Sequence, residues 1–135
     1  MSQADKEALI CIANAFGKDE SWLTEGNGYN SDVSGWNWIT VTDGRVTDID
    51  WSRDGLRGAI PKKIENLTNL HTLFLSNNSL SGDIPIELCK LTHLQYLLLN
   101  NNNLSCEMPN IYGNRNKVIQ FLETERKRVS QILLQ

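Results

Sequence analysis

The residues that most often carry catalysis are few in this sequence and are not grouped. There are two histidines, His71 and His93, and neither has a cysteine beside it in the chain. The glycines are scattered singly, without the spacing of a phosphate-binding or calcium-binding loop. Asp48 and Asp50 lie two residues apart, which in a strand places both carboxylates on one face, where they would attract a cation or a basic partner. We therefore expect no enzyme activity, no catalytic residue, no metal site and no cofactor.

The charge and the cysteines narrow the class of protein further. The 135 residues include 13 basic and 16 acidic side chains, a net charge of −3, which argues against nucleic-acid binding. No apolar run is long enough to span a membrane, and the N-terminus lacks the features of a signal peptide. Cys11, Cys89 and Cys106 are odd in number and widely spaced, unlike a disulfide framework or a zinc site. These features predict reduced thiols in a cytoplasmic protein that does not bind membranes.

A repeat with a period of 24 residues occupies the middle of the chain, and its units start at residues 46, 70 and 94. The residues three and five positions after each start are apolar, as in a strand with one buried face. Position eight holds Asp or Asn, whose side chain can bond backbone groups of the turn and of the neighbouring unit. Position twelve is glycine in the first two units, which predicts a positive φ or a close backbone approach. Each unit buries its apolar edge only against the next unit, so the units are expected to stack as a solenoid.

The prolines follow the same period. All three lie 15 residues after the start of a unit, where proline fixes φ and can begin a short helical turn: Pro61, Pro85 and Pro109. The resulting pattern, L-x-x-L-x-L-x-x-N-x-L-x-G-x-I-P-x-x-L-x-x-L over residues 46–109, resembles the plant-type leucine-rich repeat. The resemblance implies an α/β fold: a short right-handed solenoid with a parallel sheet on its concave side, short helices outside, and often a second sheet.

The chain divides accordingly into three parts of a single domain, residues 1–135. Residues 1–45 are expected to form an N-terminal cap, with a helix over about 4–16 that begins at Ser2 or Asp5. Residues 46–115 hold the three repeats. Residues 116–135 carry an apolar stripe at helical spacing, which predicts a C-terminal helix. That helix either caps the last coil or pairs with a second copy of the chain to give a homodimer.

Three tryptophans lie in a polar loop after the first helix: Trp22, Trp36 and Trp38. Their clustering suggests a cap held together by aromatic packing. This segment resembles the N-terminal cap of plant-type leucine-rich repeat proteins, which carries two cysteines. The resemblance places those cysteines at Trp36 and Asp43, so the disulfide is absent, and packing of Trp36 is expected to replace it.

The alternation of the strands also identifies the surface available to a partner. If positions three and five face the core, positions two, four and six face outward, and Phe74, Tyr96 and Leu98 form an apolar patch on adjacent strands. The predicted function is non-enzymatic binding of a protein or peptide on this concave face, with the acidic strand favouring a basic partner. The expected partner-binding residues are Asp48, Asp50, Thr72, Phe74, Tyr96, Leu98 and Asn100.

Three other interpretations stay open. The chain could be a structural unit that self-assembles through residues 116–135. The C-terminal helix could fold back over the apolar patch. The tryptophan-rich cap could bind a glycan or another small ligand.

Overall fold

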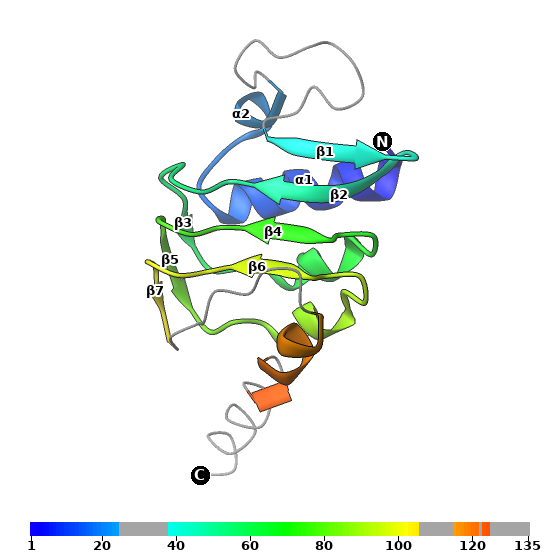
Figure 1. Ribbon diagram of the computed structural model, residues 1–135. Helices are drawn as coiled ribbons and strands as arrows, with labels where there is room; N and C mark the ends of the chain where they lie inside the picture. The colour runs from blue at the N-terminus through cyan, green and yellow to red at the C-terminus, as the bar shows by residue number, and fades with distance from the viewer. Residues whose placement is uncertain (25–37, 106–114, 122, 125–135) are drawn as a thin grey trace.

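The computed structural model describes residues 1–24, 38–105, 115–121 and 123–124 of the chain. Two helices, α1 (Gln3–Ala15) and α2 (Glu20–Thr24), precede a series of stacked coils (Figure 1). In chain order the later elements are β1 (Ile39–Thr42), β2 (Arg45–Asp50), β3 (Arg57–Gly58), η2 (Lys62–Asn66), β4 (Thr72–Phe74), β5 (Ser79–Gly82), η3 (Ile86–Lys90), β6 (Tyr96–Leu98) and β7 (Asn103–Leu104), where η marks a 3₁₀ helix.

The register of the strands reproduces the period of the sequence. Ile49 of β2 pairs with Leu73 of β4, which pairs with Leu97 of β6, and both pairings are parallel. The shorter strands β3, β5 and β7 pair in parallel as a second sheet, as the repeat implied. The stacked solenoid with helices on the opposite side from the main sheet is therefore confirmed (Figure 1).

The main sheet is mixed, whereas the sequence predicted a parallel one. β1 pairs antiparallel with β2, in the sheet order β1-β2-β4-β6. Asp43 and Gly44 form the two-residue connection with φ values of 51° and 77°, the backbone that a tight hairpin with the native strand twist requires. This turn folds the end of the N-terminal cap onto the first coil as an additional strand.

The apolar positions of the repeat form the core. The side chains at positions three and five of each coil are at most 2% exposed: Ile49, Trp51, Leu73, Leu75, Leu97 and Leu99. Buried side chains of η2 and η3 and the leucines after them close the other side of the coils. Pro61 and Pro85 immediately precede η2 and η3, as predicted, and Pro109 lies outside the described residues.

Asparagine side chains bond successive coils together. The Oδ1 atom of Asn78 accepts from the backbone N–H groups of Asp54 and Leu56, both at 3.0 Å, and its Nδ2 donates to the carbonyls of Trp51 and Leu75, both at 2.9 Å. Asn102 repeats this arrangement one coil later. Each amide therefore satisfies backbone groups of its own turn and of the preceding coil, as expected from position eight of the repeat.

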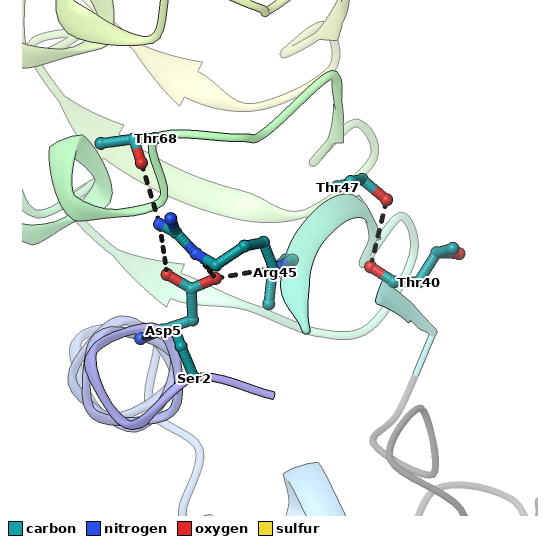
Figure 2. A network of polar contacts seen from close by, with 7 residues as sticks. Ser2, Asp5, Thr40, Arg45, Thr47 and Thr68 are labelled. Carbon is teal, nitrogen blue, oxygen red and sulfur yellow. Dashed lines mark hydrogen bonds and ion pairs between the residues drawn. The ribbon is translucent and has the colours of Figure 1, made fainter. Parts of the chain in front are cut away.

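A polar network attaches helix α1 to the first coil (Figure 2). Ser2 is the N-cap, with its side chain accepting from the N–H of Asp5 at 3.2 Å. The fully buried Asp5 carboxylate instead accepts from Arg45 Nε at 3.0 Å, from Arg45 Nη2 at 3.1 Å and from the backbone N–H of Val46 at 2.9 Å. Arg45 also donates to Thr68 at 2.8 Å. This carboxylate raises the pKa of Arg45 above its ordinary value, chiefly through the hydrogen bonds.

The close approach predicted for the repeat glycines occurs where α1 ends. Gly58 and Gly82 have φ values of 87° and 80°. A Cβ atom at Gly58 would overlap the carbonyl oxygen of Ala15, the last residue of α1. Glycine at this position therefore lets the first coil lie directly against the N-terminal helix.

Aromatic packing in the cap involves some of the predicted residues. Trp22 of α2 packs edge-on against Trp51, with ring centroids 5.2 Å apart. Phe16 also packs edge-on against Trp51, with ring centroids 6.3 Å apart. Trp36 lies outside the described residues. Trp38 is 53% exposed.

The described part of the C-terminal helix starts with residue 115 and lies beyond β6 at the end of the stack (Figure 1). Val118 is 1% exposed and Phe121 packs against the core. Arg115 Nη1 donates to the carbonyls of Leu91 and Leu94, both at 3.3 Å, at the end of the second coil.

Candidate functional site

The outward positions of the strands form rows across the sheet, on the surface called here the strand face. Strand pairing places Thr40, Asp48, Thr72 and Tyr96 side by side in the first row. It places Asp50, Phe74 and Leu98 side by side in the second row. The third row consists of Ser52, Ser76 and Asn100, each two residues beyond its counterpart in the second row. The structure thus brings all seven predicted binding residues onto one surface.

Polar contacts fix the first row. His71 Nδ1 lies 3.9 Å from a carboxylate oxygen of Asp48 and 3.1 Å from the hydroxyl of Thr72. The His71 ring also meets the ring of Tyr96, with centroids 5.0 Å apart and an interplanar angle of 50°. Thr47 donates to the other Asp48 oxygen at 2.8 Å. His71 therefore connects the acidic and aromatic ends of this row, a role that its position in the sequence did not indicate.

The second row combines one acid with apolar side chains. Asp50 is exposed, and Phe74 and Leu98 are half-buried. The Asp50 carboxylate accepts from the backbone N–H of Ser52 at 3.3 Å. Two half-buried apolar side chains on adjacent strands offer contact area to a ligand, while Asp50 gives one end of the row a negative charge.

Trp38 extends the second row, and sequence reasoning missed this placement. The N–H of Asp50 donates to the carbonyl of Trp38 at 3.0 Å, which continues the β1–β2 pairing by one residue. The backbone of Trp38 therefore lies opposite Asp50, on the other side from Phe74, just before β1 and with a φ of 54°. The sequence signal for this placement was the Asp-Gly turn flanked by alternating Val and Thr residues. A hairpin at this turn pairs the residues before it with β2, and the pairing extends back to Trp38.

The third row is polar and borders the turns. Ser76 is 6% exposed and donates to the hydroxyl of Ser52 at 3.3 Å. The next residue of each coil, Arg53, Asn77 and Asn101, has a φ of 58°. Asn101 donates to Asn77 at 2.8 Å, so side chains as well as backbone connect these turns.

In the described part of the chain, no group of three or more His, Cys, Asp or Glu side chains could hold a metal ion. Among those same residues, no helix has the length and apolar character needed to cross a membrane.

Comparison with known proteins identifies the class that this geometry defines. Residues 39–104 match the leucine rich repeat family. The ectodomain of BIR2 from Arabidopsis thaliana is 30% identical with a TM-score of 0.62, and the match covers 74% of this chain and 56% of that one. The leucine-rich-repeat ectodomain of the receptor kinase SOBIR1 from the same plant is 24% identical with a TM-score of 0.61, covering 77% and 56%. Residues 39–104 are therefore leucine-rich repeats, and the fold is that of a short solenoid of the plant type.

The chain spans little more than half the length of these two ectodomains. A further similar structure is that of PEPR1–AtPEP1, with 25% identity and a TM-score of 0.53; the match covers 80% of this chain and 19% of that one. The resemblance to these longer structures therefore concerns only part of their length.

Proposed function

We propose that this protein is a non-enzymatic interaction module that binds a protein or peptide on its strand face. The observation that carries this proposal is the alignment of Phe74 and Leu98 on adjacent strands, next to Tyr96, on the outward side of the sheet. Such side chains bury a large area on binding at a small cost in rotamer entropy, particularly the aromatic ones. Asp48 and Asp50 give the neighbouring strand a negative charge that favours a basic partner.

The double substitution Phe74→Ser with Leu98→Ser tests the proposal. Immobilised wild-type and variant chains are used to capture partners from a native lysate, and bound proteins are identified by mass spectrometry. We expect a partner that the wild type retains and the variant loses, because the variant lacks the apolar contact area. Circular dichroism should show the same helix and sheet content in both chains.

The matched control is Ile86→Ser, which removes a 48% exposed apolar side chain from η3, away from the strand face. This variant should retain the partner. A partner that binds the Phe74/Leu98 variant as well as it binds the wild type would contradict the assignment of the site.

The C-terminal helix has two candidate roles. Its buried Val118 and its core contact through Phe121 support a capping role at the open end of the solenoid. The 37% exposed Ile119 on the same helix is the observation that favours pairing with a second copy. We propose capping as the main role, with self-assembly as the alternative.

The intracellular location is also a proposal. It is supported by the free, exposed thiol of Cys11 and by Asp43 at a position where the resemblance places a cap cysteine. Fractionation of the cells that produce the protein locates it. Recovery from the secreted fraction would contradict the proposal.

A further inference from the structure

The second row of the strand face has an order that suggests how a ligand is recognised. Backbone pairing places Trp38, Asp50, Phe74 and Leu98 on successive strands. In the backbone register, Asp50 therefore lies between Trp38 and Phe74, and Leu98 completes the row. Neighbouring strands lie about 4.8 Å apart, so all four side chains are within reach of one extended peptide that crosses the sheet.

The carboxylate of Asp50 is available to such a ligand. Three ion pairs join described residues, Arg45–Asp5, His71–Asp48 and Lys90–Glu65, and Asp50 belongs to none of them. The Asp50 side chain is exposed and accepts one backbone hydrogen bond, from Ser52. A carboxylate has room for several donors, so acceptor positions remain for a partner.

The flanking residues favour a cation at this position. Trp and Phe attract a guanidinium or ammonium group through the negative faces of their rings, and Trp does so most strongly. An arginine can stack on a ring while it donates to a carboxylate. Resting on the function proposed above, we infer that Asp50, with Trp38 and Phe74 on either side, receives an arginine or lysine side chain of an extended peptide.

The spacing of the row sets a second requirement on that peptide. The gap between Phe74 and Leu98 is centred about one and a half strand spacings from Asp50, or about 7 Å. Side chains on one face of an extended peptide recur every second residue, at about 6.6 Å. An apolar side chain two residues from the cation therefore reaches the gap between Phe74 and Leu98. The ligand is a peptide with a basic and an apolar residue separated by one position.

Selection of short random peptides displayed on phage against the immobilised chain tests both requirements. We expect enrichment of Arg or Lys two positions from Leu, Ile, Phe or Met. A synthetic copy of an enriched peptide should bind roughly five- to tenfold more weakly when its arginine is replaced by the neutral isostere citrulline. Its binding should also weaken as salt is added.

Variants of the chain locate the contact. Asp50→Asn should weaken binding of the arginine peptide but leave binding of the citrulline peptide unchanged. Trp38→Leu keeps an apolar side chain without the indole and should reduce the preference for arginine over citrulline. The matched control is Asp43→Asn, which removes the same charge from the exposed β1–β2 turn, where the positive φ suits Asn, and should change neither peptide's binding.

The outcomes separate this inference from the proposed function. Enriched peptides that lack a basic residue, or that bind the Asp50→Asn variant as tightly as the wild type, overturn the cation assignment. The proposed function survives such a result if those peptides still require Phe74 and Leu98. If no enriched peptide is lost by the Phe74→Ser, Leu98→Ser variant, both proposals are wrong.

Discussion

Asp54 occupies the position at which Asn78 and Asn102 bond the later coils together, but a carboxylate cannot donate as their amides do. Its Oδ2 atom is buried and has no hydrogen-bond partner among the described residues. Burial raises the pKa of Asp54 above its ordinary value; the charge of Lys18 opposes this shift and that of Asp50 adds to it. The first coil therefore has an incomplete version of the contact that stabilises the other two.

We predict that Asp54→Asn raises the free energy of unfolding at neutral pH by about 0.5–1.5 kcal/mol, the usual net contribution of a hydrogen bond. An amide at this position can donate to the carbonyls of Trp51 and Ser52, as Asn102 does to the equivalent carbonyls of its own turn. Urea unfolding of the two chains at pH 7 measures the difference. A less stable variant would contradict the prediction.

The increase in the free energy of unfolding that Asp54→Asn gives should also depend on pH. Because the folded pKa of Asp54 is raised, its protonated form is favoured in the folded chain at acid pH. The stability that protonation confers is lost as the pH rises through the folded pKa. The difference between variant and wild type should therefore shrink as the pH is lowered below that pKa, in unfolding curves collected over the acid range.

At the scale of elements, the N-terminal helix depends on one ion pair that crosses a long stretch of sequence. Asp5 and Arg45 are 40 residues apart, and the carboxylate also satisfies the first backbone N–H of the repeat array, that of Val46. Loss of the carboxylate leaves a half-buried guanidinium and a backbone donor without their acceptor. The cost of removing one partner exceeds the net contribution of the intact pair.

We predict that Asp5→Ala lowers the free energy of unfolding by about 2–4 kcal/mol. Thermal and urea unfolding followed by circular dichroism measure the loss. The control is Lys6→Ala on the exposed side of the same helix, which should change stability by less than about 0.5 kcal/mol. Equal effects of the two substitutions would show that the network does not hold the cap.

The predictability of each element follows from the range of the contacts that define it. The buried positions of the strands and the rows of the strand face could be predicted, because parallel strands in register repeat the 24-residue period in space. The place of Trp38 required the Asp-Gly turn to be recognised as a hairpin, and the partner of Asp5 could not be predicted. The β1–β2 hairpin lies outside the period, and nothing in the helix around Asp5 indicates an arginine 40 positions away.

At the scale of the whole molecule, the described part of the C-terminal helix packs against the core at the end of the solenoid. Val118 and Ile119 are adjacent, yet the first is 1% exposed and the second 37%. Substitutions at these two positions can therefore distinguish a capping role of the helix from pairing with another chain.

We predict that Val118→Asp destabilises the fold by about 2–4 kcal/mol, because it places an unpaired charge in the apolar end of the array. Ile119→Asp should leave stability nearly unchanged. Analytical ultracentrifugation of both variants and of a chain ending at Asn114 then tests assembly. A dimeric parent that becomes monomeric and stays folded with Ile119→Asp would favour self-assembly over capping.

The bonding pattern of Asn78 reaches only its own turn and the coil before it, and that limited range makes the array extensible. A second copy of residues 70–93, placed between His93 and Leu94, would lie between the original second coil and the third, with the same register of strand pairing on both sides. Each added unit would lengthen the ligand footprint by about 4.8 Å and contribute another phenylalanine to it. Repeating the insertion would therefore give a series of proteins, each one coil longer than the one before it.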